Sequence, residues 1–306
     1  MMSGLSIRDV FNSFILCVRS RPIVFFVYSL PTFWSYLIAT WDTNGFSFFD
    51  ALILFSSVSS MALSVYFFND LSDLDDDLKN QELGNPAQAL RVLGRDRISE
   101  SRFKKFIIFT GVFSLVLAYS INYTVVIIQV LNLILGYLYS AEPIRLKKRF
   151  LMKQFTIALG TTFCILMGAV AGGGVTSATL YMGIIHFIVN MGINPIMDVR
   201  DIRGDRIMGI KTIPVVWGPE ATVRLYFASF IVMGLATFLG YTQLGLNTAL
   251  PILVGMILVA WLYVSIPLLK KWNDPIFLNS LIINRVVPFY CIMQLVTLIG
   301  IMKLPF

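Results

Sequence analysis

Residues 48–77 read FFDALILFSSVSSMALSVYFFNDLSDLDDD and join a long apolar stretch directly to a cluster of aspartates. The apolar part, 48–69, carries one charged residue, Asp50, and as a helix it can cross the roughly 30 Å hydrocarbon core of a bilayer. Backbone groups in hydrocarbon must find their hydrogen-bond partners inside the segment. We therefore predict a membrane-spanning helix whose end, from Asn69 onward, presents carboxylates at the membrane boundary.

The rest of the chain repeats this apolar pattern. Of the 306 residues, 57% are apolar and only 13% are charged, and the mean hydropathy is +0.78. A soluble domain would have about a quarter of its residues charged. We predict an all-α fold, a multi-pass membrane helical bundle of about nine transmembrane helices in which residues 1–306 form a single transmembrane domain. The expected spans are approximately 22–41, 48–69, 104–121, 123–141, 153–172, 179–197, 223–242, 248–269 and 281–302.

The positive charges mark one side of this predicted bundle. Apart from Lys303, all of the 24 Lys and Arg residues lie in the N-terminal segment or in every second connection between spans. Cytoplasmic connections carry the excess of Lys and Arg, so we expect the N-terminus and these connections to be cytoplasmic and the C-terminus to lie outside. The net charge of +7 is thereby explained by orientation, and no basic patch predicts a nucleic-acid partner.

Two aspartate clusters lie on this same predicted side. One follows the second span and the other follows the sixth, and both place aspartates at positions i, i+3 and i+7. These positions share one face of a helix. The matched spacing also suggests two pseudo-repeats, each with one acidic helix end. The six residues are Asp70, Asp73, Asp77, Asp198, Asp201 and Asp205.

Carboxylates gathered in this way repel each other unless a cation lies between them. Mg²⁺ takes hard oxygen ligands and is commonly held by one or two carboxylates together with substrate phosphates. The clusters therefore predict Mg²⁺ held between the aspartates and a diphosphate, whose departure the ion promotes. Basic residues of the same layer, Arg145, Lys147 and Lys211, are placed to bind diphosphate oxygens.

These motifs resemble those of the UbiA superfamily of intramembrane prenyltransferases. Asn69 and the first three aspartates are similar to the family's NDxxDxxxD motif, and the second cluster, continued as GIKT at 209–212, is similar to its DxxDxxxD motif. Residues 139–147 (YSAEPIRLK) resemble a YS-x-P-x-RLK segment after the fourth helix, and Arg19 resembles an arginine before the first helix. The chain departs from many members at Met197, where they have a lysine.

The resemblance implies an integral membrane enzyme that moves a prenyl group from a polyprenyl diphosphate to a hydrophobic acceptor, with Mg²⁺ as cofactor. The implied metal ligands are the six aspartates. The resemblance and the charge pattern together assign catalytic roles to Asn69, Tyr139 and Lys211, and binding of diphosphate or acceptor to Arg19, Arg145, Lys147 and Lys211. The rings of Tyr66, Phe67 or Tyr139 could stabilise the allylic cation through cation–π contact.

Several functions stay open at this point. The acceptor could be a membrane lipid of the prenylglycerol phosphate type or an aromatic, quinone-precursor ring, and the second motif slightly favours the lipid. A UbiA-type terpene cyclase would keep the metal chemistry without an acceptor. A membrane transporter would place its charges near the middle of the bilayer, whereas the acidic residues here lie at one boundary. The single histidine, His186, is expected to be buried or to line the acceptor site rather than to act as a base.

Overall fold

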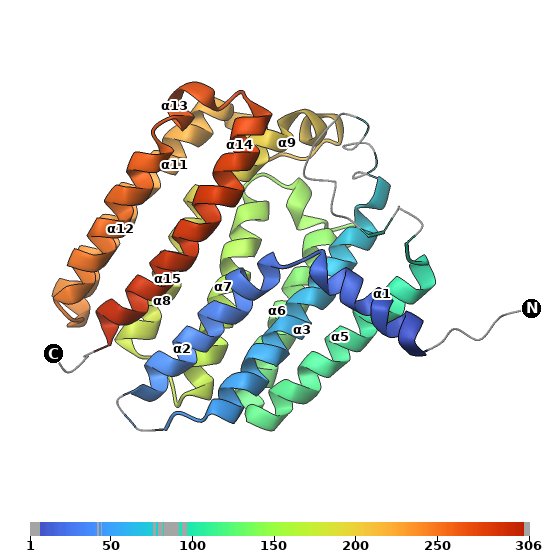
Figure 1. The fold of residues 1–306 in the computed structure, drawn as a ribbon, viewed down its shortest axis with the longest axis horizontal. Helices are drawn as coiled ribbons and strands as arrows, with labels where there is room; N and C mark the ends of the chain where they lie inside the picture. Colours follow the sequence, from blue (N-terminus) through green and yellow to red (C-terminus); the bar gives the residue numbers. More distant parts are fainter. Residues whose placement is uncertain are drawn as a thin grey trace, which may run out of the picture.

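The computed structural model describes residues 7–41, 43, 45–75, 78, 82, 92–93 and 97–302, in which all regular structure is helical. Long helices run side by side in one bundle (Figure 1). The first half contains α1 (Ile7–Arg19), η1 (Phe25–Ser29), α2 (Leu30–Trp41), α3 (Phe48–Ser72), α5 (Glu100–Ile121), α6 (Tyr123–Ser140) and η3 (Leu146–Lys148). The second half contains α7 (Met152–Ala171), α8 (Ser177–Ile188), η4 (Val189–Ile193), α9 (Ile196–Ile207), α10 (Ile213–Trp217), α11 (Pro219–Leu244), α12 (Ala249–Ser265), α13 (Leu268–Lys271), α14 (Pro275–Leu281), η5 (Ile282–Val286) and α15 (Val287–Ile301).

The predicted multi-pass helical bundle is confirmed. Seven helices in the described ranges are long and apolar enough to cross a membrane, and the count is eight when the bent pair 177–193 and 196–207 is taken as one span. These helices correspond to eight of the nine predicted spans. The first predicted span, 22–41, is helical as η1 and α2 but is not among these eight, so that nine is an approximate count. The single domain of two pseudo-repeats stays a prediction.

Small polar residues join the helices inside the apolar bundle. Helix α3 lies along α5, and α2 lies along α7. The Oγ of Ser57 donates a hydrogen bond to the carbonyl of Ser114 at 2.8 Å, and the Oγ of Ser64 donates to the carbonyl of Ile107 at 2.7 Å. Small residues let helix backbones approach closely in a membrane, and a hydrogen-bonded hydroxyl avoids most of the cost of burial. These contacts explain the close packing of α3 on α5.

In the part of the chain that the structure describes, three helices contain a π-helical turn, and each turn ends two residues before a proline. A proline has no N–H to donate, and its ring clashes with the carbonyl four residues earlier. That carbonyl belongs to the π-helical turn in all three cases, and the wider turn gives the proline ring room. The pairs of turn end and proline are Ser29 and Pro31, Ile193 and Pro195, and Val286 and Pro288.

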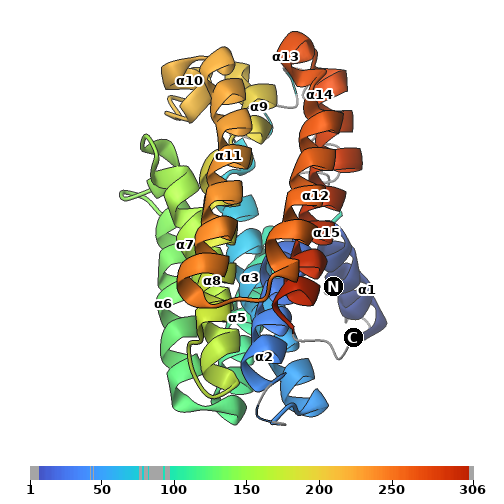
Figure 2. The same cartoon turned by 90° about the vertical axis from the view of Figure 1, so that its left-hand side faces the viewer.

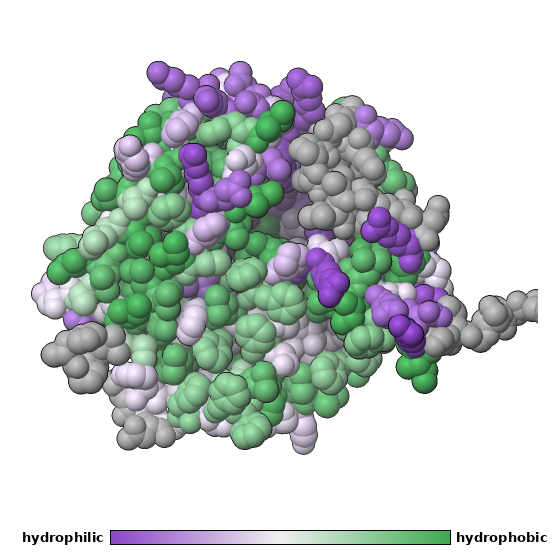
Figure 3. Space-filling view, in the orientation of Figure 1, coloured by the Kyte–Doolittle hydropathy of each residue, from purple (hydrophilic) through white to green (hydrophobic). Residues whose placement is uncertain are grey.

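Hydrophilic side chains gather at one end of the bundle. Figure 3 shows them along its upper edge and around α1, while hydrophobic side chains cover most of the visible face between the ends. Helices α9, α10, α13 and α14 all lie at this upper end (Figure 2), which also contains the second aspartate motif. The charged connections predicted from the sequence are therefore found on one side of the bundle.

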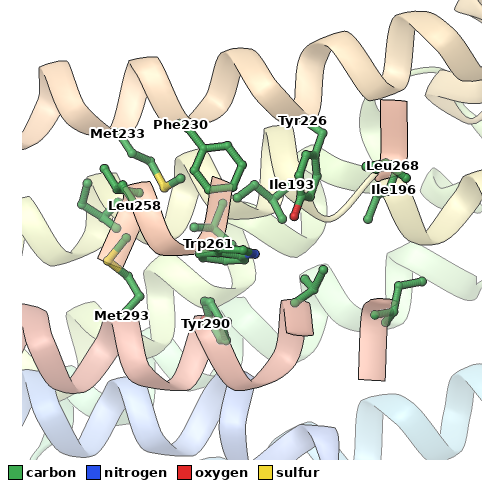
Figure 4. Packing of buried hydrophobic residues seen from close by; sticks show 14 of the residues in the cluster. Ile193, Ile196, Tyr226, Phe230, Met233, Leu258, Trp261, Leu268, Tyr290 and Met293 are labelled. Carbon is green, nitrogen blue, oxygen red and sulfur yellow. The ribbon is translucent and has the colours of Figure 1, made fainter. Parts of the chain in front are cut away.

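Aromatic side chains fill the core of the second half (Figure 4). Trp261 of α12 is fully buried, with its ring 5.5 Å from Phe230 in edge-to-face contact and 5.9 Å from Phe289 in a stacked arrangement. The hydroxyl of Tyr226 hydrogen-bonds to Ser265 Oγ at 2.8 Å. The same cluster includes buried residues of η4 and α9, so the helix that carries the second aspartate motif rests on a rigid wall.

A glycine at the contact between α2 and α7 tests this packing. A Cβ on Gly168 would lie 2.3 Å from the carbonyl oxygen of Thr32 and 2.9 Å from the backbone nitrogen of Tyr36. Backbone atoms cannot move aside easily, so we expect Gly168→Ala to lower the free energy of unfolding by about 1–3 kcal/mol. Thermal unfolding in detergent measures the change. Gly234→Ala is the matched control, because no atom lies within 4 Å of its Cβ; equal stability of both variants would contradict the packing.

Candidate active site

The first aspartate motif ends α3 and contacts Arg21, which lies between α1 and η1. Asp70 is 6% exposed, and its carboxylate forms an ion pair with Arg21, whose Nε donates to Oδ2 at 3.0 Å. The Arg21 guanidinium also lies 5.5 Å from the centre of the Tyr66 ring. A carboxylate buried to this degree needs a paired cation to stay ionised. Arg21 therefore stabilises the ionised form of Asp70.

Asp73, the second aspartate of the first motif, binds three side chains. Asn69 Nδ2 donates to Asp73 Oδ2 at 2.8 Å and also to Ser140 Oγ at 2.8 Å. Arg145 Nη2 donates to Asp73 Oδ1 at 3.1 Å, and Lys147 Nζ contacts the same oxygen. The connection after α6 thus folds onto the end of α3, and the structure brings together four of the residues predicted for the site.

Lys147 connects the two aspartate motifs electrostatically. Burial, together with the positive charges of Lys153 and Lys148, lowers its pKa to about 7, while Asp205 acts in the opposite direction. Only 5% of Lys147 is exposed. Lys147 thus binds Asp73 of the first motif and is close enough to Asp205 of the second for that charge to act on it.

The second motif lies on α9. Asp198 is buried and accepts hydrogen bonds from Lys153 Nζ at 2.7 Å and Gln154 Nε2 at 2.6 Å. Both donors belong to the first turn of α7. Asp201 is more exposed, and its two oxygens accept bonds from Arg200 Nε and Nη2, each at 3.1 Å. The start of α7 therefore neutralises the deeper carboxylate of this motif.

The remaining aspartate of the motif has an unused oxygen. Asp205 is 5% exposed, and its Oδ2 has no hydrogen-bond partner among the described residues. Leaving a buried carboxylate oxygen unpaired costs free energy, which a cation would recover. Within the ranges that the structure describes, no group of three or more His, Cys, Asp or Glu side chains forms a metal cage. Mg²⁺ does not require such a cage, because it is usually held by one or two carboxylates, waters and substrate phosphates. The residues present fit that arrangement.

Two cavities meet at this acidic edge. One, of about 110 Å³, is lined by Asn69 near the first motif and by Asn132 and Gly160 further along α6 and α7. The other, of about 210 Å³, is lined by Asp198 and Lys153 near the second motif and then by apolar residues of η1, η4 and η5. Two cavities that share one wall suit two hydrophobic substrates that react beside the acidic edge. The residues shared by both are Tyr28, Tyr66 and Ile157.

Some predicted residues lie elsewhere. Arg19 is exposed at the end of α1. Lys211 is also exposed, and its backbone N–H donates to the carbonyl of Lys148 at 3.2 Å. Asp77 lies outside the described residues. The structure therefore brings the backbone of Lys211 to the connection that carries Lys147, without showing a side-chain contact to the motifs.

The three aromatic residues predicted to contact the allylic cation lie in different surroundings. Tyr139 lines the first cavity and Tyr66 lines both. Phe67, in contrast, is fully buried, with its ring 5.2 Å from that of Phe103, and it lines neither cavity. Phe67 is a core residue of the α3–α5 contact, and Tyr66 and Tyr139 stay the candidates for contact with a cation. His186 is 2% exposed, as expected for a buried histidine.

The site also contains residues that the sequence did not single out. Arg21, Lys153 and Gln154 bind the buried carboxylates, and Tyr28 lines both cavities. Arg21 and Lys153 belong to the positive charges that indicate orientation. Their positions in the sequence could have identified them as site residues, because each lies at the boundary of a predicted span on the side that carries the aspartates.

The bundle and its site define a multi-pass helical membrane protein whose acidic edge opens onto two hydrophobic cavities. The sequence profile of the UbiA prenyltransferase family matches residues 28–281. This match covers well over half of the chain, and the chain belongs to that family.

Individual relatives agree with this assignment. The chain is 30% identical over 135 residues to the digeranylgeranylglyceryl phosphate synthase of Thermococcus sibiricus. This matched region covers 44% of the chain and 47% of that relative, about half the relative's length. It is 26% identical over 237 residues to the bacteriochlorophyll synthase 33 kDa chain of Rhodobacter capsulatus, and the match covers 73% of the chain and 72% of that relative. A solved UbiA homolog from Archaeoglobus fulgidus bound to GPP and Mg²⁺ is 18% identical, with a TM-score of 0.70 over 94% of the chain and 99% of that structure. This structural likeness shows the shared fold.

The Arg21–Asp70 pair gives a direct test of the site geometry. Removing Arg21 takes a cationic partner away from a buried carboxylate, and we expect Arg21→Ala to lower the free energy of unfolding by about 3 kcal/mol. Arg19→Ala, at an exposed position, is the matched control and should change it by less than about 0.5 kcal/mol. Denaturant titration of purified protein measures both.

A double-mutant cycle separates the pair from other effects. Because the two side chains contact each other, the Arg21→Ala/Asp70→Ala variant should lose less stability than the sum of the single variants. Strict additivity would show that the two residues do not interact in solution.

Proposed function

We propose that this protein is an Mg²⁺-dependent intramembrane prenyltransferase that moves a prenyl group from a polyprenyl diphosphate to a lipid acceptor of the prenylglycerol phosphate type. The observation that carries the proposal is the meeting of two aspartate motifs, their basic partners and two cavities at one edge. The lipid acceptor is favoured over an aromatic ring by the digeranylgeranylglyceryl phosphate synthase relatives and by Lys153, a cation that lines one cavity and suits an anionic acceptor.

The bound metal would belong between the two motifs. Asp70 and Asp73 would hold it on one side, and Asp201 and Asp205 on the other, together with diphosphate oxygens. Bound there, Mg²⁺ supplies positive charge that makes diphosphate a better leaving group. The unpaired Oδ2 of Asp205 supports this placement. A solved homolog is bound to GPP and Mg²⁺ together, which supports the use of Mg²⁺ with a prenyl diphosphate.

The basic residues would exchange partners when the donor binds. In the structure, Arg21, Arg145 and Lys147 bind carboxylates. With those carboxylates turned to a divalent cation, the same guanidinium and ammonium groups would bind diphosphate oxygens, with which they form strong charge-assisted hydrogen bonds. These hydrogen bonds would stabilise the departing diphosphate most strongly as its negative charge builds up. The bond between the prenyl carbon and oxygen breaks, the acceptor hydroxyl oxygen forms the new bond to that carbon, and the hydroxyl proton is released.

Water must be kept from the allylic cation until the acceptor captures it. The two cavities share the rings of Tyr28 and Tyr66, whose centres lie 6.0 Å apart in an edge-to-face arrangement. The electron-rich faces of such rings attract cations. This aromatic wall therefore supports capture of the cation by a second substrate from the neighbouring cavity, which a cyclase would not need.

Purified protein in lipid vesicles, given labelled geranylgeranyl diphosphate and Mg²⁺, tests the proposal. We expect product only with an acceptor and only in the absence of chelator, with a prenylglycerol phosphate preferred to an aromatic ring. Asp73→Ala and Asp205→Ala should each lower kcat/KM at least about 100-fold, a loss of about 2.7 kcal/mol of transition-state stabilisation. Asp75→Ala, at an exposed position, is the control and should stay within about twofold.

The same assay distinguishes the alternatives. Diphosphate release and a cyclic hydrocarbon without acceptor would identify a terpene cyclase. Uptake of intact prenyl diphosphate into the vesicles, with no product, would identify a transporter. Unchanged rates in both aspartate variants would overturn the proposed metal site.

We further propose that the charged edge faces the cytoplasm, because it holds the excess of Lys and Arg. Ser101 at the start of α5 and Ser177 at the start of α8 are both exposed and lie at opposite ends of the bundle. In a variant without the three native cysteines, an impermeant thiol reagent added to intact cells should label Ser177→Cys and not Ser101→Cys. The reverse pattern would show the opposite orientation, and labelling of both would contradict the span count.

A further inference from the structure

Helix α1 lies across the long helices of the bundle instead of along them (Figure 1). Its C-terminal half is fixed to the bundle, because Cys17 is fully buried in a cluster with Phe67 of α3 and Phe103 of α5. Its N-terminal half extends beyond that cluster, and every residue of 7–12 is exposed. The fixed half therefore determines which way the faces of the projecting half point.

Apolar side chains form a continuous stripe along α1. Its members follow each other at intervals of four, three and four residues, which places them on one face of a helix. They are Ile7, Phe11, Phe14 and Val18. Phe14 and Val18 pack against the buried cluster, whereas the first two members are 89% and 61% exposed. An apolar face that begins in the protein core therefore continues beyond it, without protein cover in the described part of the chain.

Contacts with α5 show which way this stripe faces. The Oγ of Ser13 accepts a hydrogen bond from Arg102 Nη1 at 2.9 Å, in the first turn of α5. The ring of the next residue, Phe14, lies 5.1 Å from that of Phe106 and 6.0 Å from that of Phe109. Phe109 is seven residues beyond Arg102, about 10 Å further into the membrane span of α5. The stripe therefore faces the hydrocarbon, and the Ser13 side faces the charged boundary.

Positive charge gathers where α1 meets the start of α5. The basic side chains of α1 and of the first two turns of α5 are Arg8, Arg19, Arg102, Lys104 and Lys105. The same segments hold two acidic residues, Asp9 and Glu100, and Glu100 is paired with Lys104 at 2.7 Å. An excess of cations beside an exposed apolar stripe is complementary to anionic lipid headgroups that lie over hydrocarbon.

We infer that α1 is an interfacial helix that binds a lipid surface, with Ile7 and Phe11 inserted among acyl chains and the basic side chains of α1 and α5 on anionic headgroups. A helix of this kind lies in the plane of the interface, with its apolar face about 5–10 Å below the headgroups. The occupant is lipid, because the stripe continues to the level of Phe109, an exposed residue of a membrane span. The inference rests on the membrane-spanning fold and is independent of the proposed reaction.

Spin labels on two adjacent residues of α1 test the depth of the helix. Only Cys291 is replaced by alanine, because Cys17 and Cys164 are fully buried, and this parent gives the background signal. Phe11→Cys and Asn12→Cys then each carry a nitroxide, in full-length protein in vesicles of equal parts phosphatidylcholine and phosphatidylglycerol. The two positions point about 100° apart around the helix.

We expect dissolved oxygen to relax the label at position 11 and a water-soluble nickel chelate to relax the label at position 12. The depth obtained for Phe11→Cys should be about 5–10 Å below the headgroups. Relaxation of both labels by the nickel chelate would show a helix that lies free in water. Access of neither reagent to Phe11→Cys would show cover by protein, such as a second copy of the chain. Either result would overturn the inference.

Nitroxide-labelled lipids test the preference for anionic headgroups. A fluorophore on Phe11→Cys should be quenched at least about twofold more by labelled phosphatidylglycerol than by labelled phosphatidylcholine, because each Lys or Arg near an anionic surface adds attraction. Arg19→Gln together with Lys105→Gln should remove most of this difference. Arg224→Gln, at an exposed position in the second turn of α11, is the matched control and should leave it unchanged. Equal quenching by the two lipids, with all basic residues present, would contradict the headgroup assignment.

Discussion

The structure depends on keeping carboxylates ionised at the edge of an apolar bundle. Asp70, Asp73 and Asp198 are each less than a tenth exposed, and each binds a cationic side chain. An uncompensated buried charge would cost several kcal/mol, so these pairs are a condition of the fold as well as of the chemistry. The cations come from other segments of the chain: Arg21 lies between α1 and η1, and Lys153 lies in the first turn of α7. The pairs therefore fix how the helices meet around the site.

A second constraint shapes the space behind that edge. Every π-helical turn among the described residues ends two residues before a proline, and all three turns line the larger cavity. A regular helix would place the proline rings against carbonyls of the preceding turn. The cavity is thus a consequence of backbone geometry. Val286 and Tyr290, which line it, belong to the same buried cluster as Trp261.

Much of this arrangement could be predicted from sequence, and the limits have physical causes. The i, i+3, i+7 spacing of the aspartates and the long apolar runs predict the bundle and its acidic edge. Asn69, Arg145 and Lys147 were predicted as site residues for other roles, and their contacts with Asp73 come from the structure. The resemblance singled out Arg19, whereas the structure pairs Arg21 with Asp70. Both arginines precede the first predicted span, and only tertiary packing buries one of them. The three prolines are visible in the sequence. Their convergence on one cavity depends on how distant helices pack, which periodicity does not report.

The central claim is that the two aspartate motifs and their basic partners form one binding site for a prenyl diphosphate with Mg²⁺. Its most direct test is the thermal stabilisation of the protein by a non-reactive thio analogue of geranylgeranyl diphosphate, measured with Mg²⁺ and with chelator. The account predicts a clear stabilisation that requires Mg²⁺ and is lost in both Asp70→Ala and Asp205→Ala, one substitution in each motif. Equal stabilisation in chelator, or full stabilisation in either variant, would contradict it.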